Sequence, residues 1–398
     1  MRIAIITENF LPKVDGVTRT LARLLEHLET TSHQVLLLGP ETNKKTYAGA
    51  QLIGTFGIPF ILYPELKINL WRPKFTTALI QFQPDVIHLV DPVCLGALGL
   101  SILRYYLPTI PIVSSYHTNL ADYCRHFGFG FLSSTMWKWN RYCHSFSHAV
   151  ACPSKSTSIT LKEHGFNNIK IWPRGVDMSF FSPGKRSSQL RSSWSCAQKT
   201  VILYVGRISY EKNIHLLIDA YKQMNHDVCH LVLVGHGPAF GEIQSVCQSS
   251  GIPVTFTGYL QGKDLSQVYA SADIFAFPST SETFGQVVLE AMASGLPVIG
   301  LEAEGVKDLV QHGRTGLLLN PVGLTETQQM LAYRELLQSI VTQRQWCDKL
   351  SEESIRQAQK YTWFDAMACM VQVYHDALPY SKQVIEINID SGVESDYA

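Results

Sequence analysis

Long uninterrupted apolar runs are missing from this sequence of 398 residues. The longest apolar stretch, residues 93–116, is interrupted by Arg104, Pro108 and Pro111, whereas a membrane-spanning helix needs about 20 consecutive apolar residues. We therefore expect no transmembrane segment. A predicted strand follows Met1 almost at once, with neither a basic segment nor a cleavage site before it, so we also expect no signal or transit peptide.

Paired cysteines and metal-binding patterns are missing too. The nine cysteines are scattered, and none forms a C-x-x-C pair or the Cys/His spacing of a zinc site. An odd, unpatterned set of this kind is typical of reduced thiols in a cytoplasmic protein. We therefore expect a cytoplasmic location and no bound metal ion.

An excess of charge of one sign is absent overall, but the two halves of the chain differ. The chain has 33 Lys and Arg against 33 Asp and Glu, and residues 1–190 hold 19 of the basic residues but only 11 of the acidic ones. A basic first half suits an anionic ligand or surface. We expect no nucleic-acid partner, because no recognition motif accompanies the charge.

Aromatic residues mixed with cations stand at three places in the first half, residues 71–74, 104–106 and 129–139. Such mixtures favour peripheral contact with a membrane of anionic lipids. The alternative is that the aromatic side chains belong to an ordinary core and the cations to a solvated surface.

Short aliphatic runs alternate with helical patterns along the chain, which is typical of parallel sheets built from βαβ units. The length favours two domains, and a polar, serine-rich link at 182–199 separates two such series. We expect an α/β protein of two Rossmann-like, doubly wound parallel-sheet domains that face a cleft, residues 1–190 and 198–360. The predicted strands are residues 2–7, 34–39, 85–90, 111–116, 149–154 and 169–172 in the first domain, and 200–206, 230–235, 254–258, 273–278 and 296–300 in the second.

The C-terminal end of the chain belongs to neither of these two series of alternating strands and helices. Residues 361–378 form a predicted amphipathic helix with Trp363, Met367 and Met370 on one side. Because this apolar face needs a partner, we expect the helix to cross back to the first domain. Residues 379–398 are polar, and we expect them to be disordered.

Several loops at the carboxyl ends of predicted strands carry glycine and charge, and this is where doubly wound sheets bind ligands. Gly16 precedes the first helix, where glycine lets the backbone approach a phosphate. Arg207 and Lys212 follow the first strand of the second domain, and two cations there can flank a diphosphate. Gly235 predicts a tight turn under a nucleotide-sized cleft, but Phe240 replaces the third glycine of a dinucleotide fingerprint, so no NAD is expected. Common turn glycines and a solvated basic loop are the alternatives.

The segment 278–300 places Glu282 just before a predicted helix and Glu290 eight residues later. The first turn of a helix has unpaired N–H groups that hold anions. A carboxylate accepts hydrogen bonds from two hydroxyls, so we expect each acid to hold a vicinal diol, one on a sugar and one on a ribose, with phosphates between them. A capping acid followed by a chance helix glutamate is the alternative. The expected ligand-binding residues here are Glu282, Phe284, Gly285, Gln286, Val287 and Glu290, with residues 284–286 in the first helical turn.

These motifs together resemble a known family. The E-x7-E pair followed by LEAMASGLPVI, with GRISYEKN before it and EGVKDLVQHGRTGLLLNP after it, is similar to glycosyltransferase family 4, a retaining family with the GT-B fold. The segments PIVSSYHT, IKIWPRGVD and LQGKDLSQVYASADIFAFPSTSETFG are similar to the sulfoquinovosyltransferases and their mannosyltransferase relatives. The resemblance covers nearly the whole chain.

The resemblance implies roles for individual residues. Glu282 would hold the hydroxyls of the donor sugar and Glu290 the ribose of the nucleotide. Arg207 and Lys212 would neutralise the diphosphate, over which the Gly16 loop would close.

His117, at the end of the predicted strand 111–116, matches the family histidine near the transferred sugar. The sequence departs from the family pattern at Asp15, where a second glycine is usual, and at Arg174, where an asparagine is usual. The residues expected to be catalytic are His117, Arg207, Lys212 and Glu282.

The implied activity is the retaining transfer of a hexosyl group from a UDP- or GDP-sugar to a hydroxyl of a lipid or amphiphilic acceptor. The resemblance implies neither a cofactor nor a metal ion, since cations and a helix N-terminus stabilise the leaving diphosphate. A nucleotide-sugar 2-epimerase or a glucan-extending synthase on the same fold is the alternative.

Overall fold

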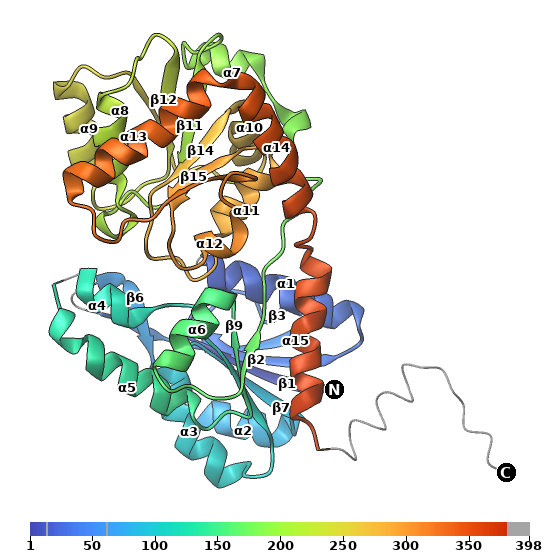
Figure 1. Ribbon diagram of the computed structural model, residues 1–398. Helices are drawn as coiled ribbons and strands as arrows, with labels where there is room; N and C mark the ends of the chain where they lie inside the picture. Colours follow the sequence, from blue (N-terminus) through green and yellow to red (C-terminus); the bar gives the residue numbers. More distant parts are fainter. Residues whose placement is uncertain (13–14, 61–62, 127, 380–398) are drawn as a thin grey trace.

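The computed structural model describes residues 1–379 apart from 13–14, 61–62 and 127. Two α/β domains lie one above the other in Figure 1, and the C-terminal helix α15 (Trp363–Ala377) runs along the side of the lower, N-terminal one. The predicted class of two doubly wound parallel-sheet domains is confirmed. The expected disorder from residue 380 onward lies outside the described residues.

The first strand of the chain, β1, lies in the middle of the sheet of the first domain. The strand order of this sheet is β10-β9-β8-β7-β1-β2-β4-β3, and all neighbours are parallel except β3 and β4. The chain builds one side from β1 outward and then returns to build the other from β7, so the topological switch lies between β1 and β7. The strands are β1 (Arg2–Thr7), β2 (Gln34–Pro40), β3 (Thr46–Tyr47), β4 (Ala50–Thr55), β7 (Val86–Val90), β8 (Ile112–Ser115), β9 (Ala149–Cys152) and β10 (Ile169–Ile171).

Helices cover both faces of this sheet, which explains why its central strands are apolar throughout. Ile3 and Ile5 point to the face covered by α1 and α15, whereas Ala4 and Ile6 point to the face covered by α2 and α3. The alternation follows from the two-residue period of a strand. The helices of this domain are α1 (Gly16–Thr30), α2 (Pro73–Phe82), α3 (Leu95–Tyr106), α4 (Leu120–His126), α5 (Ser133–His144) and α6 (Lys155–Glu163).

The segment between β2 and α2 was not predicted to contain strands. It forms β3 and β4 at the edge of the sheet, and a separate antiparallel pair of β5 (Gly57–Phe60) and β6 (Tyr63–Asn69). The sequences of β4 (AQLIGT) and β6 (YPELKIN) mix polar with apolar residues, so they lack the continuous apolar run that identifies a central strand.

The sheet of the second domain is entirely parallel, with the order β13-β12-β11-β14-β15-β16. Its switch point lies between β11 and β14. The strands are β11 (Thr200–Val205), β12 (Cys229–Val234), β13 (Val254–Gly258), β14 (Ile274–Phe277), β15 (Val298–Leu301) and β16 (Gly316–Leu319). The helices are α7 (Ser188–Ser193), α8 (Ile214–Lys222), α9 (Phe240–Ser249), α10 (Gly262–Ser271), α11 (Gln286–Ala293), α12 (Val306–Leu309), α13 (Glu326–Thr342) and α14 (Arg344–Ala358).

Helix α15 packs into the core of the first domain after the chain has completed the second. Met367, Met370 and Tyr374 are buried among side chains of β1, β2 and α1. The chain therefore passes between the domains twice, once along the link after β10 and once before α15. At the second passage, the backbone N–H of Val176 donates to the carbonyl oxygen of Tyr361 (2.9 Å), so the two passing segments are bonded together.

Candidate active site

The first carboxylate of the candidate site, Glu282, is paired with a lysine of its own domain. Lys212 ends a short 3-10 helix, and its Nζ lies 2.5 Å from Oε1 of Glu282. Nζ also donates to the carbonyl oxygen of Ser281 (3.3 Å). Both charged side chains are largely shielded from solvent, which strengthens their attraction relative to that in water. The acid expected on the sugar and the cation expected on the diphosphate thus lie side by side.

The second carboxylate, Glu290, lies inside the second domain but reaches the first. Its side chain is 2% exposed; Oε1 accepts a hydrogen bond from Nη1 of Arg19 (3.1 Å), and Oε2 accepts one from the hydroxyl of Tyr269 (3.1 Å). Burial raises the pKa of Glu290, although Arg19 and Tyr269 oppose the shift. Arg19 belongs to α1, so this ion pair crosses the domain interface.

Helix α11 begins later than the sequence predicted. Gly285 has φ of +90° and is the N-cap, so the first helical residue is Gln286 and the expected first turn of residues 284–286 is wrong. A left-handed residue cannot continue a right-handed helix, and glycine adopts that conformation without steric cost. The side chain of Phe284 is buried in the domain core and packs against Tyr361. No side chain caps the helix, so its N-terminus remains a place where an anion is stabilised.

The other two residues expected at this helix also contact protein. Nε2 of Gln286 donates to the carbonyl oxygen of Gly175 (3.1 Å), in the link between the domains. The carbonyl oxygen of Val287 accepts a hydrogen bond from the hydroxyl of Tyr269 (3.3 Å). These bonds fix the position of the helix start relative to the interdomain link.

Two loops at the carboxyl ends of β11 and β12 pack tightly against each other. Gly235 has φ of +130°, and a Cβ there would lie 1.9 Å from the carbonyl oxygen of Gly206. Only glycine fits so close a contact. Arg207 follows Gly206, and its carbonyl oxygen accepts a hydrogen bond from the hydroxyl of Tyr204 (2.8 Å). Gly235 therefore helps to fix the loop that carries Arg207.

The loop before α1 carries a carboxylate where the sequence predicted a phosphate site. Asp15 is the N-cap of α1, and its Oδ1 accepts a hydrogen bond from the backbone N–H of Thr18 (2.8 Å). A Cβ on Gly16 would meet no atom within 4 Å, so the backbone there is open to approach. A phosphate that reached this helix start would meet the negative charge of Asp15. The contact of Gly16 with a phosphate stays a prediction.

His117 lies at the carboxyl end of β8, where both of its ring nitrogens are already hydrogen-bonded. Nδ1 is 2.8 Å from Nη2 of Arg174, and Nε2 is 2.8 Å from Oγ of Ser115. The ring is buried, and burial together with the Arg174 charge holds the pKa of His117 well below its usual range. A neutral imidazole whose nitrogens are both used inside the protein cannot exchange a proton with a ligand in this arrangement. In this arrangement neither ring nitrogen of His117 is available to a ligand, and the catalytic role of His117 stays a prediction.

A buried acid fixes the backbone of the same loop. Asp91 follows β7, and its Oδ1 accepts a hydrogen bond from the backbone N–H of His117 (2.7 Å). Its Oδ2 accepts one from the hydroxyl of Thr118 (2.8 Å). Burial raises the pKa of Asp91 to about 6. The orientation of His117 is thus set by its backbone and its ring together.

Direct hydrogen bonds join the two domains around this loop. The hydroxyl of Thr283, next to Glu282, donates to the carbonyl oxygen of His117 (2.8 Å). At the start of α6, the hydroxyl of Thr157 donates to Oε1 of Glu304 (2.6 Å). The backbone N–H of Ser156 donates to Oδ2 of Asp308 (3.0 Å), and the hydroxyl of Ser156 contacts the same atom. The backbone of His117 in the first domain and the segment that carries Glu282 in the second are therefore bonded to each other across the interface.

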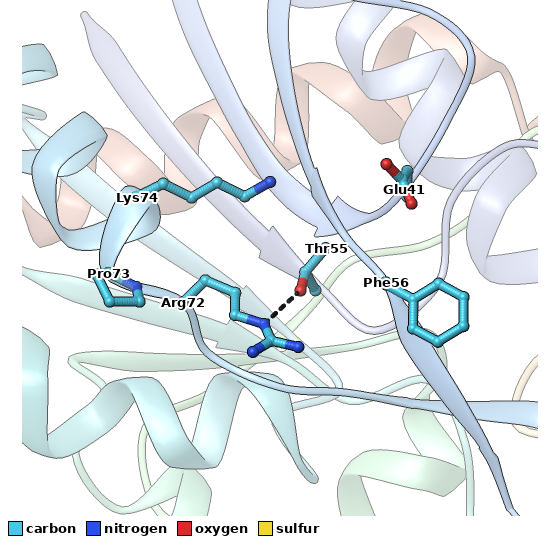
Figure 2. Close-up of a pocket in the computed structure, with 6 residues that line it drawn as sticks. All are labelled: Glu41, Thr55, Phe56, Arg72, Pro73 and Lys74. Atoms are coloured by element: carbon cyan, nitrogen blue, oxygen red, sulfur yellow. Dashed lines mark hydrogen bonds between the residues drawn. The ribbon is translucent and has the colours of Figure 1, made fainter.

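A separate hollow of about 410 Å³ lies on the first domain, away from these acids. Figure 2 shows it where β4 ends and α2 begins, with Arg72 bonded to Thr55 and Lys74 pointing across the opening. None of the predicted site residues lines it. Because its cations are exposed at the surface, the hollow does not have the buried, converging groups of a built binding site.

The aromatic residues of the first domain divide between core and surface. Trp137 was expected at the surface but is buried, with its ring stacked 3.7 Å from that of His164. Trp71 is half-buried and donates its indole N–H to the hydroxyl of Thr76 (3.0 Å). Trp139 is 42% exposed, as expected for an interfacial residue. The helical period explains the difference between Trp137 and Trp139, because residues two positions apart on α5 lie about 200° apart around the helix axis and so face opposite sides.

A metal site and a membrane-spanning helix were both expected to be absent. Among residues 1–379 with the gaps given above, no group of three or more His, Cys, Asp or Glu side chains is arranged to hold a metal ion. Within the same residues, none of the helices has both the length and the apolar character needed to cross a bilayer.

Several residues of the site were not predicted from the sequence. Arg19, Tyr269 and Thr283 contact the predicted residues across long sequence distances. Arg19 follows Gly16 by one helical turn, and this spacing would have placed it near the same helix end. Arg174 did carry a signal, since it replaces the asparagine usual in the family pattern.

Comparison with known proteins places this architecture in a class. The solved structure of Anabaena Alr3699/HepE in complex with UDP aligns with a TM-score of 0.74 over 94% of this chain and 99% of that chain, at 21% identity. Two doubly wound domains with a crossing C-terminal helix thus define a GT-B protein. The profile described as "Glycosyl transferases group 1" matches residues 189–357, and that of "Glycosyltransferase Family 4" matches residues 14–180.

Relatives of known name agree with this class. A GDP-mannose-dependent alpha-mannosyltransferase of Mycolicibacterium smegmatis is 36% identical over 81% of this chain and 85% of its own length. Sulfoquinovosyl transferase SQD2 of Arabidopsis thaliana is 31% identical over 91% and 71%, respectively. An alpha-monoglucosyldiacylglycerol synthase of Streptococcus pneumoniae is 30% identical over 80% and 75%. The chain belongs to glycosyltransferase family 4, and the resemblance inferred from its motifs is confirmed.

Proposed function

We propose that this glycosyltransferase moves a hexosyl group from a UDP- or GDP-sugar to a hydroxyl of a lipid or amphiphilic acceptor, with retention of the anomeric configuration. One observation carries the proposal: Glu282 and Glu290 flank the uncapped start of α11, with Lys212 beside Glu282. The names of the mannosyltransferase and glucosyldiacylglycerol synthase relatives support a nucleotide-sugar donor and a diacylglycerol-type acceptor.

Donor binding in this proposal is an exchange of partners. Ribose hydroxyls donate to the carboxylate of Glu290 and replace Nη1 of Arg19, which now occupies it. The diphosphate attracts Nζ of Lys212 away from Glu282, and the freed carboxylate of Glu282 accepts hydrogen bonds from the sugar. Both carboxylates and Lys212 thus have a partner before and after the donor binds, and the displaced Arg19 side chain is already 48% exposed to solvent, so no unpaired charge is left in a shielded place.

The chemical step then needs stabilisation of the departing diphosphate. The bond between the anomeric carbon and the phosphate oxygen breaks, and the acceptor hydroxyl oxygen forms its bond on the same face of the sugar. The acceptor proton passes to the departing phosphate oxygen. Lys212, Arg207 and the α11 N-terminus stabilise the charge that develops there, without any metal ion.

An amphiphilic acceptor is supported by a patch of exposed aromatic side chains on α3, on the 3-10 helix η1 (Gly130–Leu132) and on α5, which we call the aromatic patch. Arg104, Lys138 and Arg141 accompany it at the surface. Aromatic rings beside cations suit the interface of a membrane with anionic lipids. The patch consists of Tyr105, Tyr106, Phe131, Trp139 and Tyr142, all of them exposed.

A two-stage experiment tests the proposal. Thermal shift with UDP- and GDP-hexoses selects the donor, since a ligand at 100 times its Kd adds about 2.7 kcal/mol of stability. The selected donor is then incubated with diacylglycerol in vesicles, and the anomeric configuration of the product is read by proton NMR. A product inverted relative to the donor refutes retention, and conversion of the donor to an isomer without acceptor supports the epimerase instead.

Vesicle sedimentation tests the membrane contact separately. Binding to vesicles that contain anionic lipid should fall as salt is raised, because charges at a surface are screened. Trp139→Ser with Tyr142→Ser should weaken binding, whereas the same pair of changes at exposed Tyr210 and Tyr259 of the second domain should not. Equal binding by all variants refutes the role of the aromatic patch.

A further inference from the structure

A buried chain of four hydrogen bonds connects the domain interface to the C-terminal helix. Nη2 of Arg174 lies 2.8 Å from Nδ1 of His117, and Nε2 of His117 lies 2.8 Å from Oγ of Ser115. The same oxygen is 2.8 Å from Nε2 of His88, whose Nδ1 is 2.7 Å from the hydroxyl of Tyr374 in α15. All five side chains are buried, so solvent does not compete for these bonds.

The chemistry of the first member fixes the direction of the first two bonds. A guanidinium only donates, so Nδ1 of His117 must accept and the single proton of the neutral ring must sit on Nε2, from which it is donated to Oγ of Ser115. We assign the proton of the serine hydroxyl to Nε2 of His88, which lies 2.8 Å away. His88 then carries its own proton on Nδ1 and donates it to the oxygen of Tyr374. In this arrangement the two histidines hold opposite tautomers.

The surroundings keep both rings neutral and in place. Trp172 contacts the rings of His88 and His117 edge-on, and the guanidinium of Arg174 lies over its indole at 4.7 Å. Burial lowers the pKa of His88 to about 3, with a further contribution from the charge of Arg174. Nη1 of Arg174 donates to the carbonyl oxygens of Trp172 (2.7 Å) and Pro173, which anchors the start of the chain to the backbone.

We infer that Arg174, Ser115, His88 and Tyr374 are positioning residues that hold the imidazole of His117 in one tautomer and one orientation at the transfer site. This inference rests on the proposed function for its link to catalysis, though not for the hydrogen bonds themselves. Helix α15 then does more than pack against the first domain, because its Tyr374 is the last acceptor in this series of four hydrogen bonds. Tyr374 therefore affects the site although it lies 257 positions from His117 in the sequence.

NMR of the histidine nitrogens tests these four hydrogen bonds without any activity assay. In the wild-type protein, ¹⁵N signals of His117 should show the proton on Nε2 and those of His88 the proton on Nδ1. Tyr374→Phe removes the final acceptor, so the signals of both histidines should shift. Tyr333→Phe is the matched control, because it removes another buried tyrosine hydroxyl, which donates to the carbonyl oxygen of Ile299 (2.8 Å) in the second domain. Unchanged His117 signals in Tyr374→Phe, or the same tautomer on both histidines of the wild type, overturn the inference.

Kinetics with the identified donor and acceptor test the link to the site. Tyr374→Phe should lower kcat about three- to tenfold while the donor KM stays within about twofold, since losing one neutral hydrogen bond has an effect of this order. Ser115→Ala removes the hydroxyl that links His117 to His88. In that background, Tyr374→Phe should therefore cause no further loss of kcat. Additive losses in the double variant, or an equal loss in Tyr333→Phe, refute the positioning role. If no pair of donor and acceptor reacts, the proposed function fails. The NMR result still shows whether the four hydrogen bonds hold the two histidines as inferred.

Discussion

Nη1 of Arg19 lies 3.1 Å from Oε1 of Glu290, joining helix α1 of the first domain to helix α11 of the second. The carboxylate is buried, whereas the arginine side chain is 48% exposed. A pair with one exposed partner contributes little stability, because solvent and salt screen it. The cation is therefore a weak partner that a ligand can displace.

Removal of Arg19 should strengthen donor binding if Glu290 holds the ribose. In Arg19→Gln the carboxylate of Glu290 no longer has to exchange a cation for hydroxyls, so the donor Kd should fall about two- to fivefold, on the order of 0.5–1 kcal/mol. Calorimetry with the selected nucleotide measures this directly. Arg23→Gln is the control, since Arg23 forms its ion pair with Glu26 on the same helix and not with Glu290. Weaker binding by Arg19→Gln would show instead that Arg19 contacts the ligand.

The two acids of the E-x7-E pair should fail differently when neutralised. Glu290→Gln leaves a weaker acceptor for ribose hydroxyls that bind alike in ground and transition states, so the donor KM should rise. Glu282→Gln should lower kcat, because Glu282 orients the sugar whose charge and shape change during transfer. A hydrogen bond to a charged group contributes about 1.5–3 kcal/mol, so each defect should be about tenfold to a hundredfold.

Steady-state kinetics against the selected donor separates these effects. Glu302→Gln is a control, because Glu302 is an exposed acid of the same domain. If both variants lost only turnover, with unchanged donor affinity, the assignment of one diol to each acid would be wrong.

Acidification should destabilise the protein below about pH 6.5. Burial lowers the pKa of His88 and of His144 to about 3, and that of His117 well below its usual value, so between about pH 6.5 and 4 only the unfolded chain binds these protons. Each histidine then costs about 1.4 kcal/mol per pH unit. Burial raises the pKa of Glu8 to about 7 and of Asp91 to about 6, so these two carboxyls act in the opposite direction. His27 and His230 also have lowered pKa values, and Glu290 and Glu304 also have raised ones, so five histidines act against four carboxyls and stability should fall as the pH is lowered.

Urea unfolding at pH 7.5, 6 and 5 measures this slope. Glu8→Gln removes one of the opposing carboxyls and should make the fall steeper. A protein that became more stable between pH 6 and pH 5 would contradict the assignment of neutral, buried histidines.

Asp273 should be a main determinant of stability in the second domain. It is buried before β14, with Oδ1 2.7 Å from Nη2 of Arg186 and Oδ2 2.9 Å from Nη1 of Arg191. Oδ2 also accepts a hydrogen bond from the backbone N–H of Val201 (2.8 Å). Asp273→Asn leaves the buried guanidinium of Arg191 without its counter-charge, so the free energy of unfolding should fall by about 3–5 kcal/mol.

Denaturant unfolding, with Asp219→Asn as control, checks the role of Asp273. Asp219 pairs with Lys222 at the surface, where losing the pair should change stability by less than about 1 kcal/mol. Donor affinity of the folded Asp273→Asn protein should remain unchanged, because Asp273 has no contact with Glu282 or Glu290. Equal stability of the two variants would refute the prediction.

The sequence alone determined the architecture and the segment that carries the acids. Runs such as Ile3 to Ile6, apolar on both faces, could only be central strands of a covered parallel sheet, and all four residues are indeed fully buried. The spacing of Glu282 and Glu290 placed one acid before a helix and one inside it, as the structure shows. These features depend on local periodicity and on turn chemistry, which neighbouring residues encode.

The tertiary structure alone decided which partners those residues have. Arg19 with Glu290 and His88 with Tyr374 are pairs separated by 271 and 286 positions, and each exists because one domain or helix packs against another. The periodicity of the side chains along the sequence gives no information about the angle at which two domains pack, so these contacts could not be predicted. The same holds for His117: its position at a strand end followed from the sequence, but its neutral, fixed ring follows from burial beneath Arg174 and Trp172.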